Sequence, residues 1–361
     1  MISLADPAVG EDEQQRINDV IESGMLTRGS ATQDFEEGFA AFCGTNHGIA
    51  TSNGTTALHA AFHALGIGED DRVLTTSFSF AASTNAIRLC GATPVFADID
   101  PETYNLDPQA AEEVLRQQEI DAILIVHAYG LPAEMSAFVD LADEYDVALV
   151  EDAAEAHGAE YDGQRAGSIG DAGCFSFYAT KNMTTGEGGM VVTDRDDVAK
   201  GVRQFINHGR NENGRCVEVG HNFHMSDVTA AMGLAQLEKL PAINDARRSN
   251  AAQLTKGLLG VVRTPVEPAS ARHAYYLYTI RTDDRDGLGQ HLAANDVQSG
   301  VYWSPPIHRE PLYESVECSV PVTDQAAEEV LSLPVHPKLS SADIESIVDT
   351  VRDYMKQLKE I

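Results

Sequence analysis

Residues 175–189 read FSFYATKNMTTGEGG, and this stretch places Lys181 between an aromatic run typical of a β-strand and a loop of threonines and glycines. An ordinary surface lysine does not require such a setting. A lysine that forms an imine with a carbonyl compound does, because burial disfavours the charged form, lowers the pKa and frees the neutral amine. We therefore expect Lys181 to be a buried nucleophile with a lowered pKa.

Strand-like and helix-like segments alternate over the first half of the chain around this stretch. Such alternation is typical of an α/β sheet whose strands are mostly parallel. The predicted strands cover 73–78, 93–99, 122–129, 147–152, 173–180 and 188–193. The predicted helices cover 11–23, 33–43, 108–118 and 133–145, and a loop runs into a further helix over 52–66.

The C-terminal third has a different, mixed pattern. It is expected to contain a helical stretch over 225–256 that is interrupted at Pro241, a strand over 275–281, and helices over 287–295 and 341–359. A chain of 361 residues is long for a single hydrophobic core. We therefore predict a large domain of residues 1–245 and a small domain of residues 246–361.

The chain is strongly acidic, with a net charge of −31 and only seven lysines against eighteen arginines. Such a surface repels nucleic acid and anionic membranes, so we expect neither as a partner. It suits a cytosol with molar salt, where the Debye length is about 3 Å, and we interpret the protein as halophilic. The apolar runs are too short to span a bilayer and the N-terminus lacks a signal-peptide pattern, which favours a cytoplasmic location.

Two patterns could indicate an ion site, and each has a simpler interpretation. Residues 200–224 are locally basic, which suits either a bound anion or a solvated face. His221 and His224 stand three apart without a supporting ligand cluster, and the five cysteines show no CxxC spacing. We therefore expect no metal site.

Several residues fall where strands are expected to end, which is where open α/β sheets bind ligands. Asp152 could pair with a pyridinium nitrogen or cap the following segment as a helix. Phe80 could stack on a flat ring or belong to the core. Residues 53–56, Asn-Gly-Thr-Thr, could bind a phosphate at a helix N-terminus, although a cap without ligand is the commoner case. Ser176 is either a phosphate ligand or a half-buried strand residue.

Taken together, these features meet the needs of one cofactor. A phosphate cradle, a stacking aromatic ring, a carboxylate for a pyridine nitrogen and an imine-forming lysine are what pyridoxal 5′-phosphate requires. No GxGxxG follows a strand, so a dinucleotide site is not predicted. Lys181 would be the residue that holds the cofactor covalently.

Four segments, at 52–100, 151–159 (EDAAEAHGA), 175–193 and 221–240, resemble the sugar aminotransferases of the DegT/DnrJ/EryC1/StrS family. The resemblance implies a fold-type-I aminotransferase of the α/β class. Its large domain would hold a mixed, mostly parallel seven-stranded sheet, and its C-terminal domain would be a smaller α+β unit. The family also implies a homodimer with shared active sites.

The resemblance assigns cofactor-binding roles to particular residues. Lys181 matches the covalently bound lysine, Asp152 the pyridinium partner, and Glu155 a residue near the phenolic oxygen. Phosphate ligands fall on Gly54, Thr55, Thr56 and Ser176, the stacking ring on Phe80, and a contact to the partner subunit's cofactor on Asn222.

The substrate side carries four further candidates. His308 in PPIHREPLY matches a substrate-side histidine, and Tyr302 precedes it in the expected sugar pocket. Arg28, in SGMLTRG, is a further substrate candidate. His224 stands where many members read arginine in NFRM or NYRM, which leaves the mode of substrate or glutamate-carboxylate binding open.

The resemblance implies transfer of an amino group from glutamate to a nucleotide-linked keto-6-deoxy sugar, for glycan or surface polysaccharide synthesis. The TTGEGG and EDAAE segments resemble members that aminate carbon 4, such as perosamine synthases. Alternatives are a carbon-3 aminotransferase, a non-catalytic regulatory protein, and a dehydratase of the same fold. Lys181 argues against the dehydratase, because that branch has histidine in place of the lysine.

Overall fold

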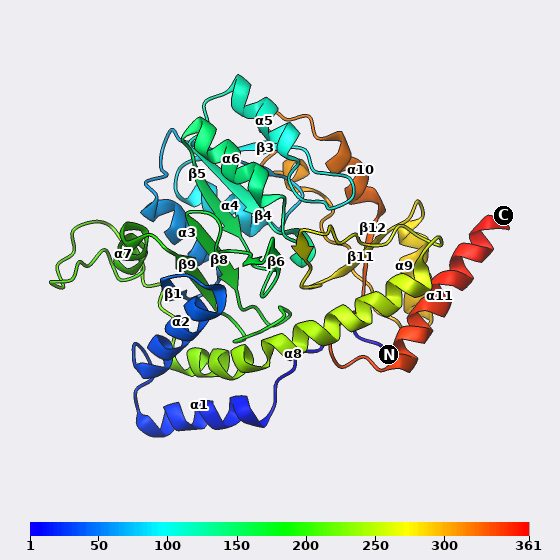
Figure 1. Ribbon diagram of the computed structural model, residues 1–361, viewed down its shortest axis with the longest axis horizontal. Coiled ribbons are helices and arrows are strands. Elements are labelled where there is room, and N and C mark those ends of the chain that lie inside the picture. The colour runs from blue at the N-terminus through cyan, green and yellow to red at the C-terminus, as the bar shows by residue number, and fades with distance from the viewer. Residues whose placement is uncertain (361) are drawn as a thin grey trace.

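A seven-stranded sheet organises the larger part of the molecule (Figure 1). The computed structural model describes residues 1–360. The strand order is β1-β9-β8-β5-β4-β2-β3, and β9 runs antiparallel to both of its neighbours whereas the other pairs are parallel. The strands are β1 His47–Thr51, β2 Arg72–Thr76, β3 Thr93–Ala97, β4 Ala122–Val126, β5 Ala148–Asp152, β8 Ala172–Ser176 and β9 Gly189–Thr193. The predicted mixed, mostly parallel sheet is confirmed.

Both faces of this sheet are covered by helices, which explains the continuous apolar runs of its central strands. In β4 every residue is buried, and Leu124 packs into one core cluster while Ile123 and Ile125 pack into another. Successive side chains of a strand point to opposite faces, so the apolar run of β4 serves both layers. The covering helices are α2 Ser30–Cys43, α3 Gly54–Ala64, α4 Ala81–Leu89, α5 Pro108–Gln117, α6 Met135–Tyr145 and α7 Asp196–Phe205.

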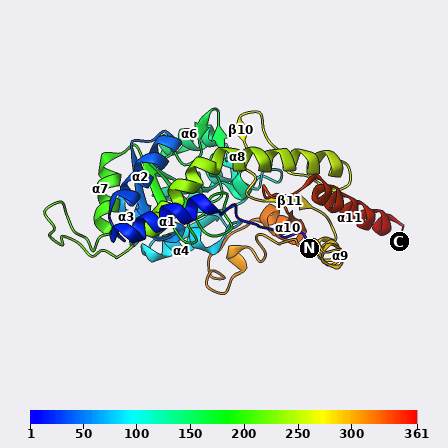
Figure 2. The same ribbon diagram turned by 90° about the horizontal axis from the view of Figure 1, so that it is seen from below.

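A single long helix, α8 Asp227–Leu258, connects the two lobes of the molecule (Figures 1 and 2). The predicted interruption at Pro241 is wrong, since the helix continues through the proline. Proline removes one backbone N–H from a helix, but packing on both sides of the position can maintain it. Leu240 is buried in a core of the large lobe and Leu254 in the core of the small lobe, and α1 Glu11–Ser23 packs along α8.

The small lobe is built around a two-stranded antiparallel sheet that packs on the end of α8. Its elements are β11 Tyr278–Arg281, β12 Val330–Leu333, α9 Arg285–Ala294, α10 Pro321–Glu329 and α11 Ser341–Lys359. Shorter elements are β6 Glu160–Tyr161, β7 Gln164–Arg165, β10 Ala271–Arg272 and the 3-10 helices η1 Ala128–Gly130 and η2 Ile307–Arg309. Because α8 runs unbroken past residue 245, the division into 1–245 and 246–361 stays a proposal.

Several helices and strands were not predicted from the sequence. The helices α4, α7 and α10 and the strand β12 were not predicted, and the strand expected at 275–281 begins only at Tyr278. The α4 sequence AASTNAIRL is rich in residues whose side chains compete with the backbone for hydrogen bonds, so its helical signal is weak. Within residues 1–360, no helix combines the length and apolar character needed to cross a membrane.

Candidate active site around Lys181

The carboxyl ends of neighbouring strands bring Asp152 and Ser176 to one edge of the sheet. Asp152 is the last residue of β5 and Ser176 the last of β8, and these two strands pair in parallel with Asp152 opposite Cys174. Ligands of open α/β sheets bind at this edge. The chain then turns from Ser176 into the loop that carries Lys181.

Lys181 is held by a carboxylate and an aromatic ring. Its Nζ donates a hydrogen bond of 3.0 Å to Glu155 Oε1 and lies 4.0 Å from the centre of the Tyr276 ring. Burial alone would lower the pKa of Lys181, but the Glu155 carboxylate beside it, together with Tyr276 and the Asp152 carboxylate, outweighs burial and raises this pKa to about 12. The expected lowered pKa is therefore wrong for the protein without ligand, because the desolvated ammonium has a counter-ion beside it.

Asp152 is buried and hydrogen-bonded rather than a helix cap. Its Oδ2 accepts 2.6 Å from Ser83 Oγ and its Oδ1 accepts 3.2 Å from the Ala154 N–H. Residues 153–159 form turns in the described chain, so the interpretation of Asp152 as a helix cap is wrong. Burial raises the pKa of Asp152, which means that a nearby cation would stabilise its charged form.

The N-terminus of α3 lies against Ser176. A Cβ added to Gly54 would come within 2.7 Å of Ser176 Cβ, so only glycine permits this approach. Asn53 Oδ1 caps the Thr56 N–H at 2.9 Å, and the Thr56 hydroxyl in turn accepts from the Asn53 N–H. The first-turn N–H groups of Gly54 and Thr55 lack intrahelical partners, as at any helix start, and are available to bind an anion.

Phe80 immediately precedes α4 and is 65% exposed. The interpretation of Phe80 as a core residue is therefore wrong. Its ring is free to stack on a planar ligand. Phe80 could thus join Lys181, the buried Asp152 and the cradle at Gly54 and Ser176. Together these residues fit a phosphate-bearing pyridine cofactor.

The substrate candidates Tyr302 and His308 come from the C-terminal segment. His308 Nδ1 hydrogen-bonds with the hydroxyl of Ser77, which directly follows β2, at 2.9 Å, and its Nε2 pairs with Asp324 at 3.1 Å. The Tyr302 carbonyl accepts from the Tyr129 hydroxyl. Burial raises the pKa of the Tyr302 phenol.

Three residues of the site were not found from the sequence. Tyr276 contacts Lys181, Ser83 donates to Asp152, and the Tyr129 N–H donates 3.0 Å to Glu155 Oε2. Each comes from a segment that is remote in sequence from the residue it contacts. Tyr276, for example, hydrogen-bonds through its hydroxyl to the Thr180 hydroxyl, 96 positions away in the sequence. No local motif could have identified Ser83 or Tyr276.

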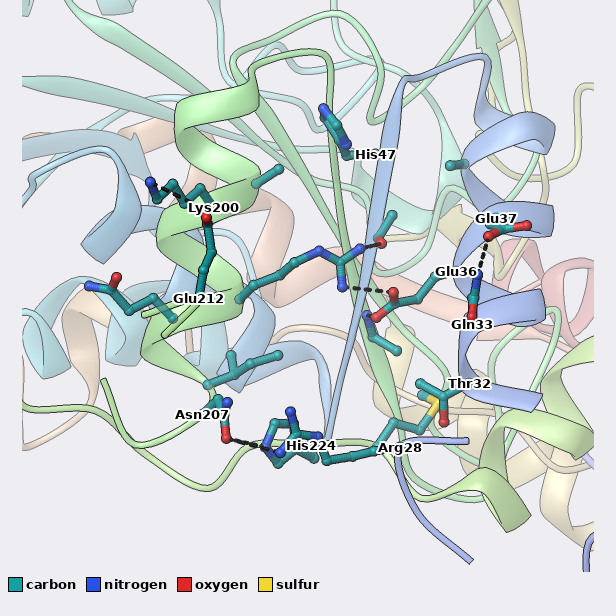
Figure 3. A pocket seen from close by; sticks show the side chains of 18 of the residues that line it. Arg28, Thr32, Gln33, Glu36, Glu37, His47, Lys200, Asn207, Glu212 and His224 are labelled. Carbon is teal, nitrogen blue, oxygen red and sulfur yellow. Dashed lines mark hydrogen bonds and ion pairs between the residues drawn. The ribbon is translucent and has the colours of Figure 1, made fainter. Parts of the chain in front are cut away.

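Arg28, Asn222 and His224 form a second group, around Asn207. Figure 3 shows Arg28 and His224 beside Asn207. The Asn207 Oδ1 accepts from Arg28 Nη1 at 3.3 Å and lies 3.2 Å from His224 Nε2. Asn222 is exposed and forms a β-bridge with Asn207. We call residues 206–226, between α7 and α8, the arm loop, and in Figure 1 this loop extends away from the body of the molecule.

Arg28 and His224 also line a cavity of about 1250 Å³ between α2, β1 and α7, part of which Figure 3 shows. Burial lowers the pKa of His224, assisted by the charge of Arg28. Arg28 is therefore the permanent cation of this pair.

The basic stretch 200–224 is partly neutralised where it faces this cavity. Lys200 pairs with Glu212 at 3.4 Å and Arg203 with Glu36 at 2.8 Å. Glu36 Oε1 also accepts from the Ala50 N–H, and Arg203 donates to the Gly48 carbonyl. These two cations therefore serve ion pairs and the free edge of β1 rather than an open anion site.

Comparison with known proteins agrees with this geometry. The model of the DegT/DnrJ/EryC1/StrS aminotransferase family matches residues 7–352. The chain belongs to this family. Among curated family relatives, the GDP-perosamine synthase of Caulobacter vibrioides is 36% identical over 359 residues, with 96% of both chains covered.

Solved structures of relatives share the whole fold. DesV of S. venezuelae superposes with a TM-score of 0.92 at 34% identity, covering 95% of this chain and 94% of that one. DesI, solved in the presence of its TDP-sugar product, has a TM-score of 0.92 at 34% identity and covers 99% and 94%. The predicted family and fold class are thus confirmed, and the chain is an enzyme of the aminotransferase family.

Proposed function

We propose that this protein is a pyridoxal-phosphate-dependent aminotransferase that moves an amino group from glutamate to a nucleotide-linked keto-6-deoxy sugar. The observation that carries the proposal is the arrangement of Lys181, Asp152 and the Gly54–Ser176 cradle at one edge of the sheet. The sugar class is supported by the relatives, one a GDP-perosamine synthase and another solved with a TDP-sugar product.

The residues divide the chemical work between binding and proton transfer. When bound, pyridoxal phosphate supplies an electron sink for the negative charge that develops on the carbon losing its proton. Asp152 would keep a proton on the ring nitrogen, and Phe80 would stack on the ring. Gly54, Thr55, Thr56 and Ser176 would bind the phosphate. Lys181 Nζ takes the proton from the amino-bearing carbon of the donor and returns it on the acceptor side.

Glu155 holds Lys181 in place between these events. The carboxylate accepts from Nζ at 3.0 Å and is itself fixed by the Tyr129 N–H. His308 and Tyr302 would bind the sugar, and the Ser77 contact fixes the His308 ring. We favour amination at carbon 4, for glycan or surface polysaccharide synthesis, because of the TTGEGG and EDAAE segments and the perosamine synthase relative. A carbon-3 aminotransferase is the alternative.

We infer a homodimer in which Asn222 reaches the cofactor phosphate of the partner subunit. Asn222 lies on the arm loop, where Val217 and Val219 are 57% and 84% exposed. Apolar side chains exposed on a projecting loop favour contact with another protein surface. Arg28 and His224, at the base of this loop, would contact the substrate or the glutamate carboxylate. The acidic surface supports a halophilic, cytoplasmic enzyme.

The absorption spectrum of the purified protein with pyridoxal phosphate, in high salt, tests the proposal. We expect a visible band from the lysine-bound cofactor that glutamate converts to the shorter-wavelength band of the aminated cofactor. The Lys181→Ala variant should show neither the first band nor the conversion. If the wild-type band forms but glutamate leaves it unchanged, glutamate is not the donor. A panel of keto-sugar nucleotides, with product analysis by NMR, then distinguishes carbon 4 from carbon 3.

A further inference from the structure

The contact between Lys181 and the face of Tyr276 is not explained by cofactor binding alone. The Lys181 Nζ lies 4.0 Å from the ring centre, well within the range of a cation–π interaction. The Lys181 side chain is only 12% exposed, so this attraction acts in a partly desolvated place where it is strong. Tyr276 lies outside the strands β5 and β8, whose carboxyl ends form the candidate site.

Two hydrogen bonds fix Tyr276 at this place. Its hydroxyl hydrogen-bonds with Thr180 Oγ1, next to Lys181, at 3.0 Å. Its carbonyl accepts 3.1 Å from Nη1 of Arg247, which also donates to the Tyr275 carbonyl. Arg247, on α8, is buried, and burial lowers the pKa of its guanidinium to about 10. Because this buried guanidinium donates to two successive backbone carbonyls, it fixes the backbone of residues 275–276.

We propose that Tyr276 is a positioning residue that holds the Lys181 ammonium through its ring face, an inference that rests on the proposed role of Lys181 as the reacting lysine. A carboxylate such as Glu155 fixes an ammonium through directional hydrogen bonds. A ring face attracts the same charge but leaves the N–H groups free to turn. Tyr276 therefore keeps the amine within reach during the intervals when it is not covalently bound.

Other charged and titratable groups also surround Lys181, and any test must separate them from the ring. Glu155 and Asp152 raise the pKa of Lys181, and burial opposes them. The phenol of Tyr302 and the buried imidazole of His157 are close enough for Lys181 to affect their pKa values. A change confined to the electron density of the Tyr276 ring leaves all four of these groups in place.

The test is a series of ring substitutions in the full chain freed of cofactor. Tyr276 is replaced by phenylalanine, and then by mono-, di- and trifluorinated phenylalanine, which keep the shape and progressively weaken the ring's attraction for a cation. The readout is the acetylation rate of Lys181 by acetic anhydride at pH 9, measured by peptide mass spectrometry. The chain contains only seven lysines, so the other six serve as internal standards.

We expect the Lys181 rate to rise stepwise across the series, by about tenfold in total, since the interaction is worth about one pKa unit at such a site. The six other lysines should not change. Equal Lys181 rates across the series, within twofold, would overturn the proposal. Because shape is conserved, a trend cannot be due to greater access of the reagent.

This outcome is independent of transamination. If the spectral test with glutamate fails while the acetylation series shows the trend, the proposed function is wrong and the ring contact is real. If glutamate converts the cofactor but the series is flat, only the role of Tyr276 is rejected. Thr180→Val is the matched control: it removes the hydroxyl that contacts Tyr276 but keeps the ring, and should change the Lys181 rate less than the trifluorinated ring.

Discussion

The side chains around Lys181 and those on the arm loop are held in different ways. Around Lys181, the polar atoms find partners within the same chain, from Glu155 to Ser83 and the Ala154 N–H. On the arm loop, Asn222 and the apolar Val217 and Val219 are exposed. The first region is preorganised by one protomer, whereas the second presents groups suited to contact something else.

This difference separates what one protomer can do from what an assembly adds. The buried and hydrogen-bonded residues Asp152 and Glu155, which we call the floor of the site, can bind and orient a cofactor ring without outside help. In the proposed homodimer, the exposed residues of the arm loop would contribute to catalysis by contacting the partner subunit. Variants in the two regions should therefore fail in different ways, and the following predictions run from the largest effect to the smallest.

Asp152→Asn tests the floor most directly. The variant removes the buried negative charge but keeps a side chain of the same size. We expect the rate of cofactor conversion by glutamate to fall by about 10²–10³-fold, in the range of losing one preorganised electrostatic contact. Single-turnover absorbance measures this rate. Ser83→Ala, which removes only the 2.6 Å hydrogen bond to Asp152, should cost far less, and an equal loss in both variants would contradict the role of the charge.

Glu151→Gln tests whether the buried carboxylate next to Asp152 stabilises the folded protein. Glu151 is buried beside Asp152, and burial, which would raise its pKa, is outweighed by His127 and by backbone N–H groups, so its pKa lies below its usual value. A depressed carboxyl pKa contributes stability above the unfolded-state value, and this contribution is lost as the pH falls through the folded-state value.

We expect Glu151→Gln to lower the free energy of unfolding by about 2 kcal/mol at pH 7. The difference from wild type should shrink as the pH falls below the unfolded-state pKa, because the unfolded chain takes up a proton there while the folded carboxylate still resists protonation. Urea unfolding at pH 7 and pH 4 measures both values. A difference that does not depend on pH would show that the loss comes from packing and not from the carboxylate.

Asn222→Ala tests the arm loop. If its side chain binds the phosphate of the partner's cofactor, the variant should bind pyridoxal phosphate about tenfold more weakly, which is the effect of one hydrogen bond to a charged group. Its free energy of unfolding without cofactor should not change, since the residue is exposed. Cofactor titration by fluorescence gives the affinity. Asn213→Ala, also exposed on the arm loop, is the matched control and should bind as wild type does.

Glu36→Ala lies between the two regions and should have the smallest effect. It removes the acceptor of the Ala50 N–H and the partner of Arg203. We expect the free energy of unfolding to fall by about 1 kcal/mol, because Arg203 is half exposed and its ion pair is worth little. Glu36→Gln, which can still accept from Ala50, should retain most of the stability. Loss of cofactor binding in either variant would show that the two regions are coupled through β1.

Local patterns were sufficient to predict where β5 ends and where α3 begins. A few neighbouring residues are enough to indicate these boundaries. They are the apolar run that ends in Asp152 and the glycine and threonines that begin α3. The positions of these residues in the structure agree with those signals. Helices such as α4 escaped because their sequences carry weak helical propensity and are stabilised by packing on the sheet.

Long-range contacts could not be predicted in this way. The sequence around Lys181 gives the lysine a buried setting, but the direction of its pKa shift depends on Glu155 and Tyr276, which come from other segments. The predicted interruption of α8 at Pro241 was wrong for the same reason. The loss of one backbone hydrogen bond is local, whereas the cores on either side of Pro241 that keep α8 continuous through the proline are built from distant residues.

The ion pair between Glu36 and Arg203 has a consequence for how copies of this chain can associate. β1 is an outer strand of the sheet, and an outer strand with open backbone groups is a template for pairing with another chain. Here the Ala50 N–H and the Gly48 carbonyl are occupied by these two side chains. Growth of the sheet through this edge into a fibre is thereby blocked, even in salt that screens the repulsion between acidic surfaces.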